Sequence, residues 1–179
     1  MVVMKLQFKI NLNDNFEKTL AFGRYSRFWD ENRDKILVSF YKHTNLRFKQ
    51  SRISIHIRED GKSRAGSRHR PMELSMLCND QQAVACTLIH ELAHRLVIGN
   101  GIEPPGSVTN NVNKYYLHRH IYLFLYDVFV DIVGEDIANE EVKRESVYND
   151  AYAKAWRWAL AMNYNERQTV FNKLKRRYI

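Results

Sequence analysis

Hydrophobic and polar residues alternate in three short stretches of the chain, which predicts three β-strands. The clearest alternation covers residues 52–58, where three isoleucines share one face and polar side chains share the other. Weaker alternation marks residues 5–12 and 72–77. Residues 59–71 are polar and contain glycine, which indicates a loop. We therefore expect the strand at 72–77 to return antiparallel to the strand at 52–58.

Apolar residues at helical spacing predict helices around these strands. Asn79 or Asp80 can cap the second helix, and Gly99 can end it. The acidic segment 135–150 leads into a last helical region that contains Trp156. The expected helices cover about residues 14–41, 81–98 and 114–133 and the region that follows 148. The pattern predicts an α+β fold in which a small antiparallel sheet packs on helices.

The chain shows no repeat and no linker, so residues 1–179 are expected to form a single domain. Its parts are a basic N-terminal helix with strands (1–75), a core that carries the candidate chemistry (76–133) and a C-terminal helical region (134–179). Residues 1–75 carry 16 basic and 8 acidic side chains, which accounts for the whole net charge of +8. The remaining 104 residues carry 12 of each and are neutral overall.

Composition excludes several classes of protein. With 45% hydrophobic and 12% aromatic residues among 179, the chain can bury a core and is not a disordered protein. Cys78 and Cys86 are too few for a disulfide framework or a Cys-based zinc ribbon. The richest apolar segment, 121–133, is interrupted by Asp127 and Asp131, and the N-terminus lacks a signal-peptide pattern. We expect a cytoplasmic protein without a membrane anchor.

Positive charge is concentrated in residues 42–70, which hold nine bases and two acids. Phe40, Tyr41 and Phe48 lie close to these bases in the sequence. A basic surface with aromatic residues is typical of sites that bind nucleic acid or another acidic partner. The alternative is an ordinary solvated surface, and a second basic cluster at 173–177 can simply favour the end of a helix.

The predicted helix at 81–98 contains the sequence HELAH, an HExxH motif at residues 90–94. Residues four apart lie on one helical face, so His90 and His94 can bind the same Zn²⁺. Glu91 can reach a water molecule on that metal without being a ligand. Zinc lowers the pKa of such a water, and Glu91 can act as the general base when the water attacks a carbonyl. The alternative is a surface helix with two incidental histidines.

The motif and its neutral neighbours resemble the zincin family of metallopeptidases. Arg95 differs from the family pattern, in which that position is usually uncharged. The resemblance implies a zinc-dependent protease, a hydrolase of peptide bonds in which the strand at 72–77 binds an extended protein or peptide substrate along its edge. Compact size and a three-histidine site are loosely similar to the SprT-like metallopeptidases, although neither His118 nor His120 is followed by the glycine usual there.

A catalytic zinc site needs a third protein ligand, and the helix at 114–133 offers candidates. At 100° per residue, His120, Asp127 and Asp131 form one polar stripe, whereas His118 points to the opposite side. We therefore expect His120 to be the third ligand. The alternatives are Asp127, then His118, then Glu135 and the acidic residues beyond it.

The two aspartates of this stripe have further interpretations. If His120 binds zinc, Asp127 or Asp131 can orient a ligand histidine through a hydrogen bond. Alternatively, both form ion pairs with bases of residues 1–75. Tyrosines that could donate to a developing oxyanion are Tyr115, Tyr116, Tyr122, Tyr148 and Tyr152.

The sequence predicts a small zinc metallopeptidase with His90, His94 and His120 as metal ligands and Glu91 as the catalytic base. The alternative function is a basic nucleic-acid-binding protein whose metal site is structural or vestigial.

Overall fold

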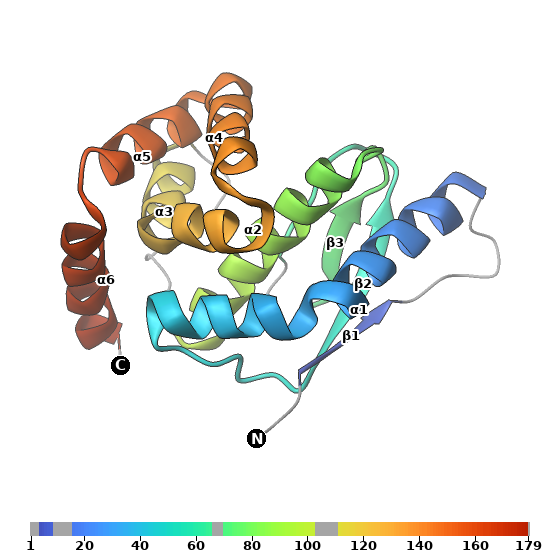
Figure 1. Ribbon diagram of the computed structural model, residues 1–179, viewed down its shortest axis with the longest axis horizontal. Helices are drawn as coiled ribbons and strands as arrows, with labels where there is room; N and C mark the ends of the chain where they lie inside the picture. The colour runs from blue at the N-terminus through green and yellow to red at the C-terminus, as the bar shows by residue number, and fades with distance from the viewer. Residues whose placement is uncertain (1–3, 9–15, 66–69, 103–110, 179) are drawn as a thin grey trace.

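A computed structural model describes residues 4–8, 16–65, 70–102 and 111–178 of the chain (Figure 1). Within these ranges the chain forms a small sheet and a larger set of helices. In chain order the elements are β1 (Lys5–Phe8), α1 (Phe16–Thr44), β2 (Arg52–Arg58), β3 (Met72–Ser75), α2 (Gln81–Gly99), α3 (Asn111–Val133), α4 (Glu135–Tyr148), α5 (Asp150–Leu160) and α6 (Tyr164–Tyr178).

The three strands form a parallel sheet in the order β1-β2-β3. Ile55 pairs with Met72 and Ile57 with Leu74 in the register of β2 and β3. The expectation of an antiparallel sheet was wrong. The connection between β2 and β3 is long enough to reverse direction twice, and the segment around Arg64 runs antiparallel to β3 instead.

The sheet lies at one end of the molecule and α3 to α6 lie at the other, while α1 and α2 extend between the two ends (Figure 1). The apolar helix α3 packs against α1, α2, α4, α5 and α6. Ile53 and Ile55 of β2 and Phe124 of α3 belong to one buried hydrophobic cluster. A single core therefore joins the sheet to the helices.

Helix α2 begins where the sequence indicates, because the side chain of Asp80 accepts a hydrogen bond from the backbone N–H of Ala83 at 2.7 Å. Most of the following residues are buried, so the HExxH motif lies inside the protein and not on a surface helix. The acidic segment 135–150, expected to lead into the last helical region, itself forms helix α4 over most of its length. None of the described helices is both long enough and apolar enough to cross a bilayer.

Candidate metal centre

Three buried histidines from two helices converge at the middle of α2. His90 and His94 lie one turn apart on α2, and His118 faces them from α3. One ring nitrogen of each lies within 4.8 Å of the others. The Nε2 atoms of His90 and His94 are 3.1 Å apart. This spacing matches two ligands of one tetrahedral ion, whose bonds to nitrogen are about 2.0–2.1 Å long. The group can hold a metal ion.

Hydrogen bonds orient two of the three rings. Nδ1 of His118 lies 2.7 Å from the carbonyl oxygen of Lys114. Nδ1 of His90 lies 2.6 Å from Oε1 of Glu145. A carbonyl or carboxylate oxygen only accepts hydrogen bonds, so Nδ1 carries the proton in both rings. Nε2 is then the nitrogen of His118 available to a metal, and it becomes available in His90 once that ring loses its second proton, as in metal sites whose histidines are held by outer hydrogen bonds.

Glu145 is a buried carboxylate from α4 that holds this centre together. Besides His90, it accepts hydrogen bonds from the hydroxyl of Tyr122 and from Nε1 of Trp156, both at 2.7 Å. Burial acts to raise the pKa of Glu145, but the positive charge of His90 and these hydrogen bonds lower it to about 2. Glu145 is therefore ionised and links α2, α3 and α5.

The pKa values of the three histidines differ because only one has a carboxylate partner. Burial lowers the pKa of His118 to about 3 and the pKa of His94 well below its usual value, and the charge of His90 adds to both effects. Burial acts in the same direction on His90, but Glu145 raises its pKa to about 9. His94 and His118 are therefore neutral at physiological pH, as metal binding requires.

Glu91 is next to the histidines and is almost fully buried, with 7% of its surface exposed. Burial raises its pKa to about 7, while the positive charge of His90, a hydrogen bond from the backbone of Ala65 and the charge of Arg95 act in the opposite direction. A carboxyl group with a pKa near 7 can both take up and release a proton at neutral pH.

His120 is not a member of this group, so His118 replaces it as the third histidine. The ring of His120 lies 6.3 Å from the ring of Tyr178 on α6, measured between centroids. His118, in contrast, packs against His90 and His94 at centroid distances of 5.4 and 4.9 Å. The polar stripe of α3 does exist, but it faces α1 and α6 and not α2.

The two aspartates of that stripe form ion pairs away from the histidines. Asp131 contacts Nζ of Lys42 at 3.0 Å and Nε2 of His43 at 2.9 Å, both on α1. Asp127 contacts Arg167 of α6 at 2.7 Å. The ion-pair interpretation is thus confirmed for Asp131, whereas the partner of Asp127 comes from the C-terminal region and not from residues 1–75.

Of the five candidate tyrosines, two lie at the centre. Tyr122 is committed to Glu145, and the ring of Tyr152 lies against His118 with 4.1 Å between centroids. Glu145 and Trp156 were not predicted as parts of the site. Their only signal was a glutamate and a tryptophan 11 residues apart in an acidic, aromatic part of the chain.

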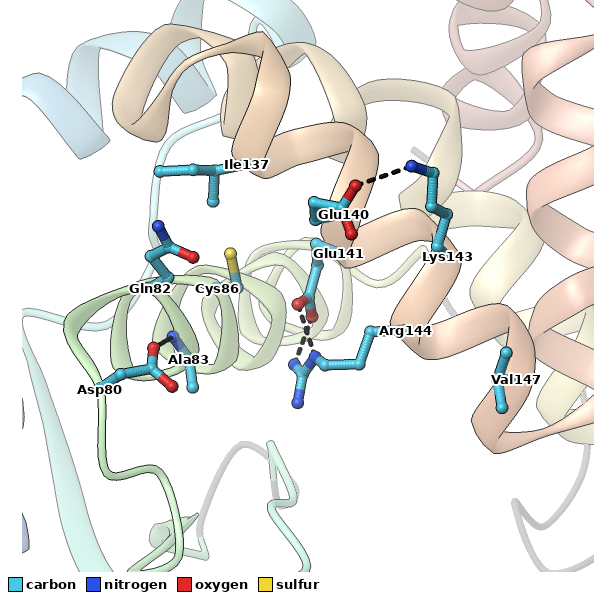
Figure 2. A pocket seen from close by; sticks show the side chains of 10 residues that line it. All are labelled: Asp80, Gln82, Ala83, Cys86, Ile137, Glu140, Glu141, Lys143, Arg144 and Val147. Carbon is cyan, nitrogen blue, oxygen red and sulfur yellow. Dashed lines mark hydrogen bonds and ion pairs between the residues drawn. The ribbon is translucent and has the colours of Figure 1, made fainter.

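A separate surface groove of about 530 Å³ lies between the first turns of α2 and helix α4 (Figure 2). It is lined by residues such as Gln82, Cys86 and Val147, and none of the three histidines takes part in it. Figure 2 shows Glu141 and Arg144 paired at its edge, with 2.7 Å between Nε of the arginine and the carboxylate. The groove is distinct from the metal centre.

Comparisons with models of protein families, with curated proteins and with solved structures found no match to this chain.

Proposed function

We propose that the protein is a zinc-dependent metallopeptidase whose metal is held by His90, His94 and His118. The observation that carries the proposal is the pair of Nδ1 hydrogen bonds, from His90 to Glu145 and from His118 to Lys114. They leave the Nε2 atoms of both rings for one ion beside a buried glutamate. Three imidazoles suit zinc, and binding would release the Nε2 proton that His90 carries at neutral pH. Three protein ligands leave an open position, which catalytic sites need.

A zinc ion at this site would act as a Lewis acid toward water and a peptide carbonyl. Glu91 would take the proton of the attacking water and then give it to the nitrogen of the leaving amine, which its pKa near 7 permits. Glu145 would keep the ring of His90 in the required tautomer. Glu91 and the three histidines are buried, which would limit the access of bulk water to the proton transfer.

The direct test replaces Glu91 with glutamine, which keeps the shape of the side chain but removes its basicity. We expect Glu91→Gln to lower the rate of hydrolysis of unfolded protein substrates by about 10²–10⁴-fold while the zinc content stays at the wild-type level. Glu140→Gln is the matched control, since Glu140 is an exposed glutamate on α4 that pairs with Lys143. Full activity in Glu91→Gln would contradict the mechanism.

A second candidate function, nucleic-acid binding, is favoured by one contact between distant parts of the chain. Nζ of Lys175 donates to the carbonyl oxygen of Thr44 at 2.7 Å, which brings the basic end of α6 beside the end of α1. The two basic clusters of the sequence therefore adjoin. Exposed members of this surface are Lys42, Arg47, Lys49, Lys173, Arg176 and Arg177.

A surface of this kind would bind the phosphate backbone, so its affinity would fall steeply with salt. We expect labelled duplex DNA to bind at low salt and to lose affinity in the variant Arg176→Gln/Arg177→Gln. Lys143→Gln, an exposed cation on α4 away from both clusters, is the control. Affinity that is independent of salt, or equal in the variant and wild type, would rule out this surface.

A further inference from the structure

The outer edge of β3 lies beside the candidate metal centre and is already covered by the chain itself. The backbone N–H and C=O of Glu73 point away from β2 and bond to the C=O and N–H of Arg64, both at 2.8 Å. The next outward N–H, that of Ser75, donates to Oγ of Ser63 at 2.9 Å. Residues 63–65, which we call the strap, thus run antiparallel along this edge.

Contacts fix the chain just before the strap and again at Arg70, beyond residues 66–69. Before the strap, the chain turns at Gly61, whose φ of +69° is one that glycine adopts easily. Asp60 fixes this turn, because its carboxylate accepts a hydrogen bond from the backbone N–H of Lys62 and pairs with Arg58. On the far side, the guanidinium of Arg95 on α2 donates to the carbonyl oxygen of Arg70.

The strap also reaches the residue proposed to be the catalytic base. Ala65 is buried, with 7% of its surface exposed, and its backbone donates a hydrogen bond to the carboxylate of Glu91. A peptide substrate needs the same two features, a free strand edge for its backbone and access to Glu91. Residues 63–65 of this chain occupy the strand edge and also contact Glu91.

We propose that the strap is an internal occupant of the substrate edge, so that the enzyme is latent until an extended peptide or a partner displaces residues 63–65. This inference rests on the proposed peptidase function. It also explains Arg95, the charged residue that differs from the zincin pattern. Its side chain holds Arg70, five residues after the strap, against α2.

The bridge between Arg64 and Glu73 consists of backbone bonds only, so it can be broken without changing the metal site. Arg64→Pro removes the N–H that donates to Glu73, and Arg64→Ala keeps both backbone groups as a matched control. We expect Arg64→Pro to raise kcat/KM for an unstructured, fluorescently labelled casein peptide at least tenfold. Arg64→Ala should stay close to wild type, and all three proteins should contain equal zinc.

A second pair of substitutions tests the opposite change and does not depend on the folding of the proline variant. Arg64 and Glu73 form a hydrogen-bonded antiparallel pair, whose Cα atoms are typically about 5.5 Å apart, within the range that a disulfide spans. The double variant Arg64→Cys/Glu73→Cys should be inactive when oxidised and become active on reduction. Equal activity in the two redox states would overturn the proposal.

Peptide binding separates this inference from the proposed function. The double variant Glu91→Gln/Arg64→Pro should bind the casein peptide at least tenfold more tightly than Glu91→Gln with an unaltered strap. If it binds more tightly but no zinc-loaded form hydrolyses the peptide, the peptidase function fails and the strap proposal stands. If wild type hydrolyses the peptide and a folded Arg64→Pro neither hydrolyses it faster nor binds it more tightly, the strap proposal fails.

Discussion

At the scale of single residues, the ability of the three histidines to bind one ion depends on the orientation of each imidazole ring. His90 has a carboxylate on Nδ1 and His118 has a backbone carbonyl there, whereas His94 has no hydrogen bond to Nδ1 among the described residues. The buried carboxylate of Glu145 is itself satisfied by three donors, so its charge is stable inside the protein. Removal of that charge should therefore first affect His90, whose Nδ1 bonds to Glu145.

We expect Glu145→Gln to weaken zinc binding by about 10–100-fold, the usual effect of losing a partner of a ligand histidine. Glutamine has nearly the same volume but no charge, and it is a weaker acceptor for Nδ1 of His90. Competition with a chromophoric chelator measures the change in Kd. Glu140→Gln on the same helix is the control, and an unchanged Kd in Glu145→Gln would show that Glu145 does not support the ligand.

The sequence could predict only the part of the site that lies on one helix. His90, Glu91 and His94 lie within five consecutive residues of one helix, so local spacing alone places them together. His118 could not be chosen over His120 in this way, since both lie on α3 and only the packing of α3 decides which face meets α2. Glu145 comes from a third helix, and no local pattern relates it to His90.

At the scale of elements, α3 is an apolar helix with two polar faces that serve different purposes. One face carries His118 and Tyr122 toward α2 and α4, and the other carries Asp127 and Asp131 toward α6 and α1. A buried polar stripe indicates that partners exist but does not identify them. Asp127, the alternative metal ligand, and Asp131 instead form ion pairs with α6 and α1.

The ion pair of Asp131 should stabilise the fold in a pH-dependent way. Burial acts to raise the pKa of Asp131, but hydrogen bonds from Lys42, His43 and Ser39 lower it below its ordinary value. A lowered pKa means that the contribution is complete above the unfolded pKa of about 4 and is lost as the pH falls through the folded pKa.

We therefore expect Asp131→Asn to reduce the free energy of unfolding by about 1 kcal/mol at pH 7, and by less as the pH falls below 4. Urea denaturation of both proteins across this pH range measures the difference. Asp34→Asn, which removes an exposed carboxylate of α1, should leave the free energy of unfolding close to wild type. A difference that grows toward low pH would contradict the assignment of the ion pair.

At the scale of the whole molecule, the candidate metal centre joins helices that are distant in the sequence. Its histidines come from α2 and α3, and Glu145 adds α4. The helical content was largely predictable from periodicity, since each helix depends on local spacing. The direction of the strands was not predictable. A loop with one tight turn at Gly61 can either join two strands as an antiparallel pair or cross over so that they run parallel.

Because a bound ion would bridge α2 and α3, its removal should destabilise the entire domain. At free zinc a thousand times above Kd, binding adds about 4 kcal/mol, which corresponds to roughly 10 °C in Tm for a domain of this size. Thermal unfolding with zinc and with EDTA measures this shift. His90→Ala/His94→Ala should show no response to EDTA, and an equal shift in that variant would place the metal elsewhere.

Zinc content measures most directly whether His90, His94 and His118 form one metal site, as we propose. Wild type, His118→Ala and His120→Ala are purified, dialysed against metal-free buffer and analysed by mass spectrometry. We predict about one zinc per chain in wild type and His120→Ala, and a loss of zinc in His118→Ala. Zinc retained in His118→Ala but lost in His120→Ala would contradict the account.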